Sequence, residues 1–114
     1  MIILPIKKQW FDMILNGEKI EEYREIKTYW AKRIYSEVDN RNCAEVLIRN
    51  GYSENAPALL CKCHIRVGKG IQEWGADPDK YYYVFKIIEI KDKLNLGDNN
   101  KWRRNKNVRV LWTK

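Results

Sequence analysis

A chain of 114 residues has room for one domain, with a core large enough to fold without disulfide bonds or metal ions. Its composition, 45% hydrophobic and 32% charged, excludes a disordered chain, and no segment approaches the roughly 18 continuous apolar residues that cross a membrane. The first residues lack the basic region of a signal peptide, and the three cysteines fit no disulfide or zinc pattern. We therefore expect a cytoplasmic protein, used in its form from Met1, with no cofactor, no metal and no membrane partner.

The net charge of +7 is concentrated near the C-terminus. Residues 93–114 contain seven Lys or Arg and one Asp, a net of +6, so the body of the chain is almost neutral. This basic C-terminal extension also has two tryptophans, and cations beside aromatic rings are the combination that binds single-stranded nucleic acid. The alternative is a terminus that only improves solubility. The candidate nucleic-acid contacts are Lys101, Trp102, Arg103 and Arg104.

The first half of the chain alternates between strand and helix patterns. A short apolar run ends at Pro5, where a missing backbone donor costs least, and the next apolar residues recur at helical spacing until Gly17. Glycine ends helices because it adopts positive φ without strain, and Thr28 is a typical N-cap for a second helix. The predicted elements are a strand at 2–4, a helix at 7–16, a strand at 19–25 and a helix from Thr28 to about Val38.

The second half of the chain is dominated by strand patterns. Aromatic and β-branched residues fill the run at 81–90, which favours a central strand, and glycine and proline separate it from the preceding elements. The predicted elements are strands at 43–49, 59–67 and 81–90, a short helical turn at 71–74 and a last short strand at 108–112.

A basic row lies along one side of the predicted strand at 59–67. Its members, Lys62, His64 and Arg66, alternate with the apolar set Leu59, Cys61, Cys63, Ile65 and Val67. We expect the apolar set in the core and the basic row in contact with nucleic acid, with His64 as a neutral hydrogen-bonding or stacking group. The alternative for His64 is an exposed surface histidine. Neighbouring residues of a strand point to opposite faces, so we expect no metal site between Cys63 and His64.

The stretch GEKIEEYR at residues 17–24 is where we expect the chemistry. A lysine held in a pocket loses its proton and acts as a base or nucleophile, a carboxylate relays protons, and an arginine fixes an anionic group. Lys19 and Glu22 are therefore candidate catalytic residues, with Glu73 as a further carboxylate, and Arg24 is a candidate substrate contact. The alternative is a solvated, charged strand that follows a helix cap.

Strand geometry puts a condition on this hypothesis. Successive side chains of a straight strand point to opposite faces, which separates Lys19 from Glu22. The two side chains converge only if Lys19 still belongs to the turn after Gly17, or if the strand carries a β-bulge.

The spacing of Gly17, Lys19, Glu22 and Arg24, G-x-K-x-x-E-x-R, resembles the signature of the ASCH domain family, a branch of the PUA-like β-barrels. The order of elements and the segment QEWGA at 72–76 are also similar, so the resemblance covers roughly residues 1–92. It implies an α+β fold: a PUA-like barrel of about five to six mixed strands with two main helices at the side. It also implies a cleft beside the motif, with Gly17, Tyr23 and Arg24 as substrate contacts.

The resemblance implies a role in binding RNA or a modified nucleoside. One bacterial branch of the family hydrolyses the acetyl amide of N4-acetylcytidine with a lysine, a threonine and a glutamate, and other members are associated with RNA cleavage. Lys19 falls at the position of that lysine, Glu73 is the best candidate for the glutamate, and Glu22 stands where that branch has threonine. The alternatives to a binding module are therefore a small amidohydrolase or ribonuclease that uses Lys19, and a non-catalytic protein-interaction domain.

Overall fold

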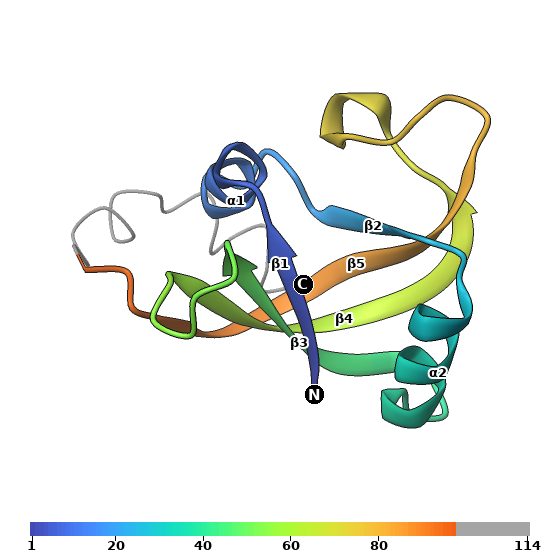
Figure 1. The fold of residues 1–114 in the computed structure, drawn as a ribbon, viewed down its shortest axis with the longest axis horizontal. Helices are drawn as coiled ribbons and strands as arrows, with labels where there is room; N and C mark the ends of the chain where they lie inside the picture. The colour runs from blue at the N-terminus through green and yellow to red at the C-terminus, as the bar shows by residue number, and fades with distance from the viewer. Residues whose placement is uncertain (98–114) are drawn as a thin grey trace.

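The structure is a computed structural model that describes residues 1–97. It has an α+β fold in which two α-helices and one 3-10 turn accompany five strands (Figure 1). In chain order the elements are β1 (Ile2–Ile6), α1 (Lys8–Leu15), β2 (Glu21–Glu25), α2 (Thr28–Glu37), β3 (Cys43–Asn50), β4 (Ala58–Lys69), η1 (Gln72–Trp74) and β5 (Tyr81–Leu94). The strand predicted at 108–112 and the candidate contacts Lys101, Trp102, Arg103 and Arg104 lie outside the described residues.

The five strands form one mixed sheet in the order β1-β3-β4-β5-β2. β1 runs parallel to β3, and the other three pairings are antiparallel. Two register shifts in the β4–β5 pairing, next to Leu60 and Lys62, each leave one extra residue on β5, and they bend the long β4–β5 pair, because a β-bulge kinks its strand and increases the local twist. Figure 1 shows this curvature along β4 and β5. The short strands β1 and β2 are left at the two edges.

The predicted α+β class, the mixed strands and the two main helices are confirmed, but a closed barrel is not. Among the described residues β1 pairs with β3 and β2 pairs with β5, so the sheet stays open between its two edge strands. Each edge strand has only five residues, and Pro5 in β1 has no backbone N–H to offer a further partner.

The main core lies on one face of the sheet and is covered by α1, and a smaller buried cluster of Ala76, Tyr82 and Val84 is separate from it. The predicted inward positions Leu59, Cys61, Cys63 and Ile65 are buried in the main core, but Val67 is 57% exposed, because β4 extends past the core to Lys69. α2 has no fully buried residue, and its Trp30 and Ile34 pack only partly against the core. The core residues are Ile2, Leu4, Ile6, Phe11, Ile14, Leu15, Ala44, Val46, Ile48, Leu59, Cys61, Cys63, Ile65, Phe85 and Ile87.

The end of α1 has the predicted geometry. Gly17 has a φ of 79°, and the amides of Gly17 and Glu18 donate to the carbonyls of Ile14 and Met13 at 3.0 and 2.8 Å. This pair of bonds is a Schellman motif, which satisfies carbonyls at the helix end. The predicted cap of the second helix is wrong by one residue, because Lys27 precedes the helix without a side-chain cap and Thr28 is already helical.

No helix among residues 1–97 is long and apolar enough to cross a membrane.

Candidate functional site

A cleft of about 940 Å³ opens at the gap between the edge strands β1 and β2. Its walls come from both edge strands, from α1 and α2, from the loop after β3, from η1 and from the start of β5. This volume is within the range of clefts that bind small molecules and cofactors. The lining residues that carry rings or charges are Lys7, Lys8, Trp10, Glu22, Tyr23, Arg24, Tyr29, Trp30, Tyr52, Trp74 and Tyr82.

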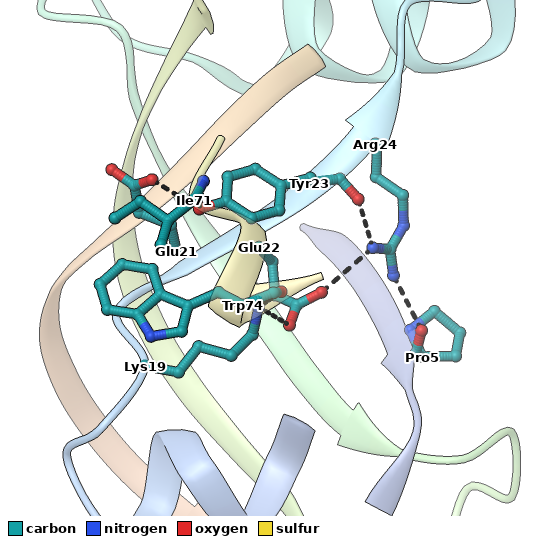
Figure 2. A network of polar contacts seen from close by, with 8 residues as sticks. All are labelled: Pro5, Lys19, Glu21, Glu22, Tyr23, Arg24, Ile71 and Trp74. Carbon is teal, nitrogen blue, oxygen red and sulfur yellow. Dashed lines mark hydrogen bonds and ion pairs between the residues drawn. The ribbon is translucent and has the colours of Figure 1, made fainter. Parts of the chain in front are cut away.

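Lys19 meets the geometric condition set by strand alternation. β2 begins only at Glu21, so Lys19 still belongs to the turn after Gly17, and its amide donates to the carbonyl of Met13 at 3.2 Å. From the turn the side chain runs behind Glu22, with Nζ 3.1 Å from Glu22 Oε2 (Figure 2). The predicted convergence of Lys19 and Glu22 is therefore present without a bulge in β2.

The ammonium group of Lys19 is buried among partners that favour a cation. Nζ donates to the carbonyl oxygen of Trp74 at 2.5 Å and lies 4.9 Å from the ring centroid of Trp10 and 5.1 Å from that of Tyr23. The side chain is 1% exposed. Burial lowers the pKa of Lys19 below its ordinary value, while the neighbouring Glu22 carboxylate opposes that shift.

Arg24 connects the two edges of the open sheet. Its Nη2 donates to the carbonyl of Pro5 in β1 at 2.8 Å, and its Nη1 donates to the carbonyl of Tyr23 at 2.8 Å (Figure 2). Nη1 also lies 3.3 Å from Glu22 Oε1, and the guanidinium stands 5.6 Å from the ring centroid of Trp30. Glu22 is thus held between two cations at the base of the cleft.

Tyr23 anchors the segment that carries Trp74. Its hydroxyl donates to Glu21 Oε1 at 2.8 Å and accepts from the amide of Ile71 at 2.9 Å (Figure 2). Burial raises the pKa of Tyr23, which keeps the hydroxyl protonated and able to donate. Further along, the amide of Asp77 donates to the hydroxyl of Tyr82 at 2.9 Å, so side chains from two strands fix this segment.

Gly75 allows α1 and η1 to meet at the cleft. It has a φ of 103°, and a Cβ at this position would lie 3.1 Å from Cζ2 of Trp10. The absence of a side chain therefore lets the Trp10 ring pack against the backbone just after Trp74.

Of the six residues predicted as catalytic or as substrate contacts, three border the cleft and three do not. Glu22, Tyr23 and Arg24 line it. Lys19 lies behind Glu22 and contacts Trp74 instead, and Gly17 acts at the end of α1. Glu73 is exposed in η1 and is not among the lining residues, although its neighbour Trp74 is.

Sequence reasoning missed the aromatic walls of the cleft. Trp10 and Trp30 lie in the two predicted helices and Trp74 lies in the predicted helical turn at 71–74, and nothing in those local patterns indicates that the three rings share a cleft. The available signal was the unusual number of rings, five Trp and seven Tyr in 114 residues. Their gathering from separate elements depends on tertiary contacts.

The basic row does not border the cleft. In the sheet register His64 is paired with Lys86, which is paired with Glu21, whereas Glu22 lies on the opposite face. Lys62 is also in register with two acidic residues, and Arg66 lies 3.5 Å from Glu21 Oε2. The row is therefore interspersed with carboxylates, and His64 is half-buried.

The cysteines are buried and free. Burial raises the pKa of Cys61 to about 12, so its thiol is a poor nucleophile and metal ligand. In the range 1–97 no group of three or more His, Cys, Asp or Glu side chains is arranged to hold a metal ion.

Comparison of the chain with protein-family models, with curated proteins and with solved structures finds no match in any of the three.

Proposed function

We propose that this protein binds a nucleobase, as a modified nucleoside or as one nucleotide of an RNA, in the cleft between β1 and β2. The observation that carries the proposal is the cleft itself, whose walls combine aromatic rings with three cations and one carboxylate. Any nucleobase can stack on such rings, because every base has a π face, and nearby cations bind the phosphate that accompanies the base.

The resemblance of residues 17–24 to the ASCH signature supports the same proposal. We include in it a PUA-like architecture, since β1 and β2 lie at the two edges of a bent sheet and Arg24 reaches from one to the other. In this view the motif residues shape the base of the cleft: Glu22 and Arg24 border it, and Lys19 supports Glu22 from behind.

A matched pair of tyrosines on α2 tests the proposal. Tyr29 lines the cleft and is 63% exposed, whereas Tyr35 on the same helix is 87% exposed and does not line it. We expect Tyr29→Ala to weaken nucleoside or short-RNA binding about tenfold, in line with about 1–3 kcal/mol per stacked base, and Tyr35→Ala to leave it unchanged. Titration by calorimetry measures both. Equal effects of the two substitutions, or no binding by the wild type, would contradict a nucleobase site in the cleft.

The hydrolase alternative has one observation in its favour. Burial lowers the pKa of Lys19, and Lys19 contacts a carboxylate that borders the cleft, so a proton could pass between them. Against it, the ammonium is enclosed by Trp10, Glu22 and the Trp74 carbonyl and does not itself line the cleft. Binding is therefore the function that the geometry supports best.

Incubation with N4-acetylcytidine distinguishes binding from hydrolysis. We expect the nucleoside to be recovered unchanged after long incubation with equimolar protein. Release of more than one acetate per protein, lost in Glu22→Gln while the fold persists, would establish the enzyme instead.

A protein-interaction role has less support, since a solvated charged face is expected to leave Lys19 and Glu22 exposed, and they are 1% and 5% exposed.

A further inference from the structure

We propose that the cleft selects an uncharged aromatic ring that carries an anionic group such as phosphate, and rejects rings that carry a positive charge. The inference rests on the proposed function and specifies the chemical class of its ligand. Aromatic-walled sites in proteins serve either to stack flat neutral rings or to hold cations against π faces. The charges and ring contacts of this cleft distinguish between the two uses.

The charge balance around the cleft is positive. Its lining contains three cations, Lys7, Lys8 and Arg24, and one anion, Glu22. Lys19 adds a cation directly behind Glu22, and outside the lining Asp12 pairs with Lys8 at 2.6 Å. Among residues 1–97, the charged lining residues and their ion-pair partners outside the lining are therefore four cations and two carboxylates, a net of +2, which favours a ligand with negative charge.

Cations of the protein already lie over several of the aromatic rings that line the cleft. Lys19 Nζ lies 4.9 Å from the Trp10 centroid and 5.1 Å from the Tyr23 centroid, and Arg24 Cζ lies 5.6 Å from the Trp30 centroid. A cationic ligand ring stacked on the opposite face of Trp10, Tyr23 or Trp30 would therefore lie close to a positive charge of the protein. A neutral ring has no such cost and gains the same apolar contact.

The carboxylate in the lining is also not available as a counter-ion. Glu22 Oε2 lies 3.1 Å from Lys19 Nζ and Oε1 lies 3.3 Å from Arg24 Nη1, so both oxygens face cations. The residue is 5% exposed. A carboxylate whose charge is not already matched would favour a cationic ring, and no such group lines this cleft among residues 1–97.

Two isomeric nucleotides test the inference in the full-length protein. N6-methyladenosine monophosphate has an uncharged ring at neutral pH, whereas 1-methyladenosine monophosphate has a cationic ring and the same number of atoms apart from one proton. We expect the neutral isomer to bind at least about tenfold more tightly by calorimetry. A matched pair for cytosine, N4-methyl and 3-methyl cytidine monophosphate, guards against a preference for pyrimidines.

Variants show whether the named cations cause the discrimination. Arg24→Gln and Lys19→Met each remove one cation and should reduce the ratio between isomers severalfold, whereas Glu22→Gln should increase it. Lys62→Met, on the opposite sheet face, is the control and should leave the ratio unchanged. Circular dichroism checks that each variant is folded, and the wild-type ratio stands even if one variant is not.

The outcomes separate this inference from the function beneath it. Tighter binding of the neutral isomer supports both. Equal or tighter binding of the cationic isomer overturns the inference and leaves nucleobase binding in place. Failure of all four nucleotides to bind overturns the proposed function, and the inference with it.

Discussion

At the scale of single residues, the most unusual feature is a lysine buried at a position where a hydrophobic side chain would have a lower free energy of burial. Lys19 is 1% exposed, and removing an ammonium from water costs several kcal/mol unless partners replace the lost hydration. Here the partners are the Glu22 carboxylate, the Trp74 carbonyl and two aromatic faces. These contacts link the turn after α1 to β2 and to η1, so the lysine ties three parts of the cleft together.

Burial of Lys19 should leave a signature in the pH dependence of stability. Its folded pKa lies below the unfolded value of 10.5, so between the two values the unfolded state binds more protons. The contribution of Lys19 to the free energy of unfolding is therefore fully present above 10.5 and is lost as pH falls through the folded pKa. We expect the stability of wild type relative to Lys19→Met to increase from neutral pH towards 10.5.

Urea unfolding of both proteins at several pH values measures this difference. The comparison is needed because Tyr23 and Cys61, whose pKa values are raised, lower the stability of both proteins at alkaline pH. A difference that is constant with pH would show that Lys19 keeps an ordinary pKa in the folded state.

At the scale of elements, the Arg24 side chain spans the gap between β1 and β2. Arg24 makes hydrogen bonds to Pro5 and Tyr23 carbonyls and faces the Glu22 carboxylate, and hydrogen bonds to charged groups are worth about 1.5–3 kcal/mol. We expect Arg24→Ala to lower the free energy of unfolding by about 2–4 kcal/mol.

Arg33→Ala is the matched control for Arg24. Its Nη2 also donates to a carbonyl of the N-terminal segment, that of Met1 at 3.0 Å, but at the exposed surface. We expect a loss of less than about 1 kcal/mol in urea unfolding. Losses of similar size in the two variants would show that Arg24 does not hold the edges of the sheet.

The junction between α1 and η1 gives a second prediction at this scale. An alanine at Gly75 would have its Cβ 3.1 Å from Trp10 and a φ of 103°, whereas Gly51 has a φ of 96° with nothing within 4 Å of the added Cβ. We expect both substitutions to Ala to lose about 1–2 kcal/mol from backbone strain, and Gly75→Ala to lose more. Gly75→Ala should also weaken ligand binding, because it displaces the Trp10 wall, and Gly51→Ala should weaken it less, because its added Cβ meets no neighbouring atom although Gly51 also lines the cleft.

Urea unfolding of Gly75→Ala and Gly51→Ala measures the two losses of stability, and ligand titration of the same variants measures the change in affinity. If Gly51→Ala weakens binding as much as Gly75→Ala, backbone strain around the cleft rather than the Trp10 contact sets the affinity.

At the scale of the whole molecule, charge is divided between the described body and the C-terminal residues. Residues 98–114 contain six Lys or Arg and one Asp, a net of +5, which leaves +2 for residues 1–97. Counterion release makes each neutralised phosphate contribute a slope of about −0.7 in log affinity against log salt concentration for single strands.

Removal of residues 98–114 should therefore reduce the salt dependence of RNA binding more than it reduces nucleoside binding. We expect the slope for a short single-stranded RNA to become shallower by about one or more, and the affinity for a nucleoside monophosphate to change less than about threefold. Filter binding across a salt series measures the first and calorimetry the second. An unchanged slope would mean that the basic C-terminal residues do not contact RNA.

Local patterns in the chain were sufficient to predict the elements and part of the site. Hydrophobic period and glycine position predicted α1, its end at Gly17 and the buried face of β4, because these depend on near neighbours in sequence. Strand alternation also gave the condition that Lys19 must lie in the turn or the strand must carry a bulge, and the structure meets it through the turn.

The cleft depends on contacts between residues far apart in the chain, which no local pattern contains. Trp10, Trp30 and Trp74 come from three elements, and the sheet order that leaves β1 and β2 at opposite edges brings them around one gap. Strand register places the row at Lys62, His64 and Arg66 on the other face, and Glu73 is exposed in η1. Residue types and spacing therefore indicated which chemistry was present, while strand register and the packing of η1 on Lys19 determined which groups share a site.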